Sequence, residues 1–189
     1  MKKVISFCLA LMLLFSLAGC QNTPASTEAP TDAPTDAPTE APTEAPAFTG
    51  SLSDLIAELY KKTDLGDLSM GDPQSVDLSD EYQVTYFLGL SSADKVQEAM
   101  VSEPMIGSIA YSLVAVRVKD ASDAVSVAEE MAKGINTRKW VCVEADALHV
   151  AAKGDLVLLY MVDSSLFDVP ATDMIDHFEE IVGTLDYRK

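Results

Sequence analysis

The stretch LVLLYMV, residues 156–162, offers no polar face on either side of an extended chain. A strand with one face in water alternates apolar and polar residues, so this stretch predicts a strand buried on both faces, at the centre of a sheet. Two further short apolar runs, residues 140–144 and 148–152, precede it, with tight-turn residues at Ala145-Asp146 and Lys153-Gly154-Asp155. These three runs predict an antiparallel meander.

A fourth strand is predicted ahead of the meander, at residues 109–119. There Val114, Val116 and Val118 alternate with Arg117 and Lys119, as in a half-buried strand. Two helices are predicted on either side of the meander, one starting at Ser122 and one at about residues 171–185. Each has apolar residues on one face: Ala124, Val127, Ala128, Met131 and Ile135 in the first, and Met174, Ile175, Phe178, Ile181, Val182 and Leu185 in the second.

The first part of the domain is predicted segment by segment. Residues 51–62 predict a helix with Ser51 or Ser53 as its N-cap, and residues 63–80, with their glycines and proline, predict a loop. Residues 81–90 fit either a short helix capped by Ser79 or a strand, and residues 93–101 have a weakly helical pattern. We therefore expect an α+β fold with a small antiparallel sheet of about four strands, core order β-α-β-β-β-α, and helices packed on one face.

The N-terminus has the pattern of an export signal. Two lysines precede an apolar run at residues 4–17, which is too short to span a hydrocarbon core of about 30 Å. The run ends in Leu17-Ala18-Gly19-Cys20. This stretch resembles the bacterial lipoprotein signal, which implies cleavage before Cys20 and a diacylglycerol thioether on it, often with a third chain such as palmitate. The alternative is an ordinary secretory signal in which Cys20 is incidental.

Lipidation of Cys20 would decide where the protein resides. One acyl chain binds a membrane marginally, whereas two or more anchor it stably. We therefore expect the chain at the extracytoplasmic face of the cell membrane, in three parts: a signal peptide at residues 1–19, a lipidated and disordered tether at residues 20–47, and a single domain at residues 48–189.

The predicted tether is a repeat of Thr-Glu/Asp-Ala-Pro beginning at residues 27, 31, 35, 39 and 43. It has no large apolar residue between residues 21 and 47, so it cannot offset the entropy cost of ordering. A proline in every repeat favours polyproline II, in which the five repeats reach about 60 Å. The segment is interpreted as a spacer that lifts the domain off the membrane.

The charge balance excludes one class of partner. The chain has 30 acidic and 13 basic residues, without the basic footprint of a nucleic-acid-binding protein. Beyond the membrane contacted through the lipid on Cys20, the expected partner is a protein or another component of the cell envelope.

Two segments of the domain resemble a known lipoprotein family. They are residues 102–120, which include Ser102-Glu103-Pro104-Met105-Ile106-Gly107-Ser108, and residues 134–143, which read Gly-Ile-Asn-Thr-Arg-Lys-Trp-Val-Cys-Val. Both are similar to a family of Firmicutes lipoproteins catalogued as a domain of unknown function, number four-three-five-eight. The likeness covers most of residues 77–183 and implies a small domain behind a lipobox and a tether, with no site residues to carry over.

Metal binding has two candidate locations. On a helix, His177 lies one turn from Asp173 and near Glu180, which could share a divalent cation. The loop at residues 64–81 is rich in carboxylates and could supply oxygens to calcium, although its spacing does not match an EF-hand. A solvated acidic helix face and ordinary turn residues explain the same patterns, so no metal ligand is assigned.

The remaining candidates favour structural roles. Cys142, the one cysteine of the predicted domain, is expected to pack as a small apolar residue, His149 to line the less buried face of its strand, and Trp140 to cap the edge of the core. No nucleophile lies in an activating motif, so neither catalytic residues nor cofactors are assigned. The sequence favours a non-enzymatic binding or adaptor domain; the alternatives are a small carboxylate-dependent cell-wall hydrolase or a divalent-cation-binding surface domain.

Overall fold

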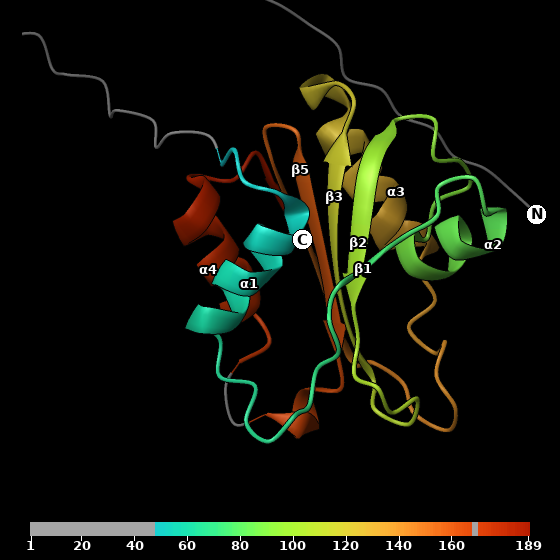
Figure 1. The fold of residues 1–189 in the computed structure, drawn as a ribbon, viewed down its shortest axis with the longest axis vertical. Helices are drawn as coiled ribbons and strands as arrows, with labels where there is room; N and C mark the ends of the chain where they lie inside the picture. The colour runs from blue at the N-terminus through green and yellow to red at the C-terminus, as the bar shows by residue number, and fades with distance from the viewer. Residues whose placement is uncertain (1–47, 168–169) are drawn as a thin grey trace, which may run out of the picture. The chain divides into compact units, whose positions relative to one another are not determined.

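The computed structural model describes residues 48–167 and 170–189. The predicted signal peptide, the lipidation site Cys20 and the predicted tether lie outside these residues. The described residues form an α+β domain around an open sheet in the order β1-β2-β3-β5-β4-β6, with all neighbouring strands antiparallel (Figure 1). The strands are β1 (Gln74–Ser75), β2 (Val96–Ser102), β3 (Tyr111–Val118), β4 (Ala147–Lys153), β5 (Leu156–Val162) and β6 (Tyr187–Arg188).

The strand β5 has the central position that its sequence predicts. All seven of its residues are buried, and β3 and β4 pair along its two edges over its full length. The tight turn at Gly154, with φ +57°, joins β4 to β5. The predicted strand buried on both faces is therefore confirmed.

Helices cover both faces of the sheet, so the expectation that they pack on one face is wrong. One face carries α1 and α4 and the other carries α3, with α2 beside it (Figure 1). Alternate residues of β5 show why: Leu158 and Tyr160 face the core under α1 and α4, whereas Val157 and Leu159 face the core under α3. An entirely apolar central strand leaves no face for water and requires both layers. The helices are α1 (Leu52–Lys62), α2 (Glu81–Gln83), α3 (Ala124–Gly134) and α4 (Asp173–Val182).

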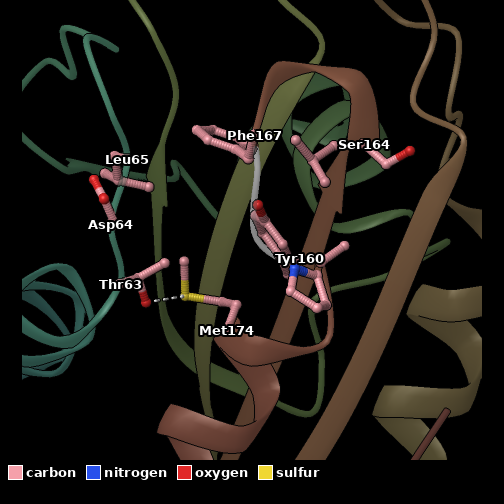
Figure 2. A pocket seen from close by; sticks show the side chains of 10 residues that line it. Thr63, Asp64, Leu65, Tyr160, Ser164, Phe167 and Met174 are labelled. Atoms are coloured by element: carbon pink, nitrogen blue, oxygen red, sulfur yellow. Dashed lines mark hydrogen bonds between the residues drawn. The ribbon is translucent and has the colours of Figure 1, made fainter.

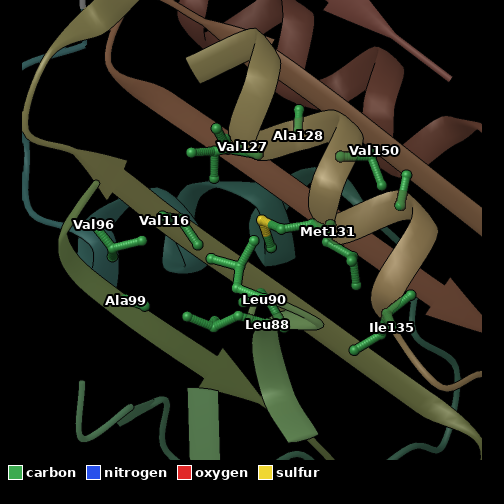
Figure 3. Close-up of a cluster of buried hydrophobic side chains, with 14 of the residues drawn as sticks. Leu88, Leu90, Val96, Ala99, Val116, Val127, Ala128, Met131, Ile135 and Val150 are labelled. Atoms are coloured by element: carbon green, nitrogen blue, oxygen red, sulfur yellow. The ribbon is translucent and has the colours of Figure 1, made fainter. Parts of the chain in front are cut away.

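The core under α3 draws on distant parts of the chain. Figure 3 shows Val127 and Met131 of α3 above Val116 of the sheet, with Leu88 and Leu90 completing the cluster. Leu88 ends a π-helical turn, Val84–Leu88, that continues from α2. The chain then turns at Gly89, whose φ is +67°. Gly134, the last residue of α3, packs against the Gly89 backbone so closely that a Cβ on Gly134 would overlap the Gly89 carbonyl oxygen.

The helix α1 begins at one of the two predicted caps. Ser51 Oγ accepts a hydrogen bond from the Asp54 backbone N–H at 3.1 Å, and the Asp54 carboxylate accepts one from the Ser51 N–H at 3.1 Å. This reciprocal capping box satisfies two N–H groups that a helix start leaves unpaired. Leu55, Ile56 and Leu59 are fully buried on the inner face.

The predicted strand at residues 140–144 is a loop, so the predicted core order is also wrong. A strand there would have to pair with the outer edge of β4, but the C-terminal end of the chain occupies part of that edge: Val150 and Lys189 exchange two backbone hydrogen bonds of 3.1 and 2.8 Å. The loop instead carries the chain from α3 to β4. Cys142 lies in it with φ +64° and is exposed, so it does not pack as a small apolar residue.

Strand β2 lies where a weakly helical pattern was expected. The register of β2 against β3 shifts between Val96 and Glu98, and this irregularity breaks the alternation of apolar and polar residues. Of residues 81–90, which fit either a helix or a strand, residues 81–88 are helical, with Asp80 rather than Ser79 as the N-cap of α2. The short strands β1 and β6 were not predicted, because two residues give no periodic signal.

Candidate functional site

A buried lysine joins three parts of the chain at one end of the sheet. The Lys139 side chain is 1% exposed, and its ammonium lies 2.6 Å from Glu103 Oε1 and 3.3 Å from Ser112 Oγ. Glu103 directly follows β2, Ser112 is the second residue of β3, and Lys139 comes from the loop after α3. The ammonium thus holds the two loops at this end of the sheet against the start of β3.

Three aromatic rings surround the same ammonium. It lies 4.8 Å from the ring centroid of Tyr86, 5.1 Å from that of Phe87 and 5.4 Å from that of Trp140. A cation over an aromatic face is attracted by the ring quadrupole, by about 2 kcal/mol or more when it is desolvated. Burial nevertheless lowers the pKa of Lys139, and the Glu103 carboxylate only partly offsets this effect. Trp140 also packs against the core under α3, as expected of a tryptophan at the core edge.

Exposed apolar side chains gather around this buried cluster. Met105 is 84% exposed, Ile106 59%, Val141 72% and Tyr82 70%. The loops of Met105 and Val141 are joined by a hydrogen bond from the Val141 N–H to the Gly107 carbonyl oxygen at 3.4 Å. Tyr82 stacks on Tyr86, with ring centroids 5.4 Å apart. We call Tyr82, Met105, Ile106 and Val141 the apolar rim, and the end of the sheet that carries the two loops the free end (lower right in Figure 1).

The opposite end of the sheet holds the start of the domain. Arg117 of β3 donates hydrogen bonds to the Gly50 carbonyl oxygen at 2.8 Å, to Asp155 at 2.7 Å and to Glu98 at 3.0 Å. Because the predicted tether precedes Gly50 in the sequence, we call this end the attached end. Arg117 lies five positions after Ser112 in β3, which corresponds to about 17 Å along the strand. The rim loops therefore extend from the end of β3 opposite to the one that holds Gly50.

Two pockets among the described residues differ sharply in size. A pocket between α1, β5 and α4, lined by Thr63, Tyr160 and Met174 among others, has a volume of about 10 Å³ (Figure 2). That volume accommodates about one water molecule. A wider open hollow of about 650 Å³ lies between α2 and the start of β2 and is lined mainly by polar residues, including Glu81 and Gln97.

Residues of the two predicted metal sites have other hydrogen-bond or ion-pair partners in the structure. His177 Nδ1 lies 2.9 Å from Thr63 Oγ1, and Glu180 pairs with Lys62 at 2.9 Å. In the acidic loop, Asp64 accepts a hydrogen bond from the Gly66 N–H and Asp77 accepts two from Ser79, as turn residues do. Within residues 48–167 and 170–189, the structure groups no three or more His, Cys, Asp or Glu side chains in a way that could hold a metal ion.

The other two single-residue candidates lie in β4 and in the loop after α3. His149 is half-buried in β4, opposite Tyr160 of β5. Cys142 lines an open hollow of about 300 Å³ together with Trp140, one of the three rings around Lys139, and with Arg138 and Glu144, which pair at 2.5 Å. The Lys139–Glu103 pair itself was missed by sequence reasoning, because 36 positions separate the two residues and both read as ordinary surface charges.

Comparisons of the chain with protein-family models, curated proteins and solved structures gave no match. The resemblance to the Firmicutes lipoprotein family therefore stays a prediction. In the described part of the chain, none of the helices combines the length and apolar character needed to cross a bilayer.

Proposed function

We propose that this chain is a lipid-anchored binding protein at the extracytoplasmic face of a bacterial membrane, whose domain meets its partner through the apolar rim. The observation that carries the proposal is the placement of the rim at the free end of β3, while Gly50 is held at the attached end. A domain anchored through Cys20 and a spacer of about 60 Å would then present its rim away from the membrane.

The composition of the rim supports contact with a macromolecule. Large apolar side chains that gather on an exposed surface are a mark of interaction sites, whereas isolated ones are ordinary. Leu166, 42% exposed, lies in the turn that follows β5 at the same end of the sheet, while Val125 lies in the first turn of α3. The exposed apolar residues are therefore concentrated at the free end.

The buried lysine supports the proposal by explaining how exposed loops stay in place. Loops without secondary structure lose binding energy to ordering when they bind. Here the ion pair with Glu103 and the hydrogen bond to Ser112 hold both loops before any partner arrives. Lys139 is a positioning residue in this proposal, since its ammonium is inaccessible to a ligand.

In-cell photo-cross-linking tests the proposal directly. A photoreactive amino acid at position 106 is compared with one at position 125, which is also an exposed apolar site but lies on α3. We expect position 106 to capture a specific partner in the anchored protein, and Cys20→Ser to reduce that capture. Equal capture at positions 106 and 125, or capture at 125 alone, would contradict the proposal.

A further inference from the structure

The open hollow of about 650 Å³ lies at the start of β2, whereas Met105 and Ile106 of the apolar rim follow the other end of that strand. Its volume falls within the range of about 300–1,000 Å³ that is usual for small-ligand sites. Charged, polar and apolar side chains all contribute to its lining, and those that matter here are Leu78, Glu81, Val84, Asp94, Gln97 and Lys119.

Lys119 differs from the other cations of the domain. Within the described residues, every other lysine and arginine ahead of Lys189 forms an ion pair with a carboxylate. The Lys119 ammonium instead donates a hydrogen bond of 2.7 Å to the backbone carbonyl oxygen of Asp94. Its positive charge is therefore not neutralised, although the chain has 30 acidic residues.

The two carboxylates of the same hollow are also without a partner. Neither the Glu81 nor the Asp94 carboxylate forms a hydrogen bond or an ion pair within the described residues, and both residues are exposed. The side-chain amide of Gln97 likewise has no hydrogen-bond partner there. The register of β2 against β3 skips Gln97, and a bulge of this kind redirects a side chain.

We propose that this hollow binds a small zwitterion that carries a free ammonium and a free carboxylate, as amino acids and short peptides do. The ligand's ammonium would face Glu81 and Asp94, and its carboxylate would face Lys119. The proposal concerns a second site and does not rest on the proposed function of the rim.

The remaining lining favours a peptide within this class. A primary amide such as that of Gln97 both donates and accepts hydrogen bonds, which matches a peptide group. Leu78 and Val84 add apolar surface that a ligand side chain would cover. The hydroxyls of Ser79 and Ser91 already donate to carboxylates of the protein, so the free polar groups of the hollow are mainly the charged ones and the amide.

A ligand with a single charge fits this arrangement less well. An anion would be attracted by Lys119 but repelled by the two carboxylates, and a cation would meet the opposite combination. Only a ligand with both charges gives each of the three groups a partner of opposite sign. The same reasoning predicts that blocking either end of a peptide removes a favourable contact and leaves a repulsive one.

Four versions of the tripeptide Ala-Leu-Ala test the proposal: both ends free, the amino end acetylated, the carboxyl end amidated, and both ends blocked. Binding to the full chain in a neutral detergent is followed at about 50 mM salt through the amide NMR signals of Ser92 and Gln97. We expect the free tripeptide to bind with a Kd below about 1 mM. Each single block should weaken binding at least about fivefold. Free leucine, measured alongside, shows whether an amino acid or a peptide is preferred.

Substitutions assign each end of the ligand to its residues. With Lys119→Met, the free and the amidated tripeptide should bind equally, whereas Lys119→Arg should keep the preference for a free carboxyl end. With Glu81→Gln and Asp94→Asn together, the preference for a free amino end should disappear. Lys61→Met is the matched control, because Lys61 is an exposed lysine of α1, which covers one face of the sheet through the other core cluster.

Three results would overturn the proposal: no shift of the Ser92 and Gln97 signals with about 10 mM free tripeptide, equal binding of the four tripeptides, or an equal effect of Lys61→Met and Lys119→Met. None of them bears on the rim. If position 106 captures a partner in cells while the tripeptides do not bind, only the zwitterion site is wrong. If the tripeptides bind as expected while position 106 captures nothing, only the proposed function is wrong.

Discussion

A cation lies at each end of β3. Arg117 belongs to the strand, whereas Lys139 reaches the start of the strand from the loop after α3, and the two differ in exposure and in the kind of partners around them. At the attached end, Arg117 is 13% exposed and binds two carboxylates that are themselves 47% and 41% exposed, together with a backbone carbonyl. At the free end, Lys139 is 1% exposed, has one carboxylate partner and is enclosed by three rings.

This difference shows two solutions to fixing a loop. The Arg117 contacts are polar, involve two half-exposed carboxylates and hold the chain at a point where it is already next to α1. The Lys139 contacts are desolvated, so each depends strongly on the others. The second arrangement ties down loops whose outer side chains stay apolar and exposed, which is what a preformed binding surface needs.

Removal of Lys139 is expected to have the largest effect on stability. Lys139→Ala would leave Glu103 without its partner and open space among the three rings, and we expect the free energy of unfolding to fall by about 3 kcal/mol. Urea denaturation measures the change. The double variant Lys139→Met with Glu103→Gln removes both charges and keeps the volume, so it should lose only about 1 kcal/mol. An equal loss in the two variants would show that the ion pair is unimportant.

At the attached end, Arg117→Ala should cost less. Its carboxylate partners are half-exposed and can be hydrated when it is removed, so we expect a loss of about 1–2 kcal/mol. Hydrogen exchange should accelerate in the first turn of α1, where Gly50 loses its contact. Glu98→Gln removes only one of the three contacts and should stay within about 0.5 kcal/mol. A loss larger than that of Lys139→Ala would reverse the comparison of the two ends.

The pH dependence of stability should distinguish the free end. Burial lowers the pKa of Lys139 below its usual value, so between that lowered pKa and about pH 10.5 the unfolded chain holds its proton more tightly than the folded chain. Stability due to Lys139 therefore rises with pH in this window. We expect the free energy of unfolding of the wild type, minus that of Lys139→Met, to increase as the pH is raised above the lowered pKa of Lys139 toward about 10.5. A constant or falling difference would contradict the burial argument.

The smallest effect on stability is expected at the rim itself. Ile106→Ser replaces a side chain that is 59% exposed. The free energy of unfolding measured by urea denaturation should therefore change by no more than about 0.5 kcal/mol. Val125→Ser, on α3, serves as the control with similar chemistry. If Ile106→Ser destabilised the chain as strongly as Arg117→Ala, Ile106 would be a packing residue of the domain. The rim would then not be a surface available to a partner.

The parts of the fold with a strong periodic signal could be predicted. The α+β class, the strands β3, β4 and β5 and the helices α1, α3 and α4 all follow from apolar periodicity, capping and turn residues. The strand β2 could not be predicted, because the register shift at Val96 breaks its alternation. Residues 140–144 have the composition of a strand but no free partner, and strand pairing over long sequence separation is not visible in a local pattern.

The candidate site was less predictable than the fold. The sequence predicts Trp140 at the edge of the core, but the charge that organises the site is its neighbour Lys139, whose partners Glu103, Ser112 and Tyr86 come from other elements. Burial of a lysine depends on the tertiary structure, since lysine is almost always exposed. The Lys139–Glu103 pair could be predicted only by someone who already knew that the loops after β2 and α3 meet, and no local sequence pattern shows this.

The antiparallel pairing of β3 has a mechanical consequence. If the proposed partner pulls on the rim while the proposed membrane anchor pulls on residue 50, the two loads act near opposite ends of β3, where Lys139 contacts Ser112 and Arg117 contacts Gly50. The ladder hydrogen bonds to β2 and β5 lie perpendicular to the strand, so this load shears them together rather than peeling them apart one at a time. A domain loaded in shear resists force far better than one that is unzipped, which would suit the proposed role of holding a partner at the cell envelope.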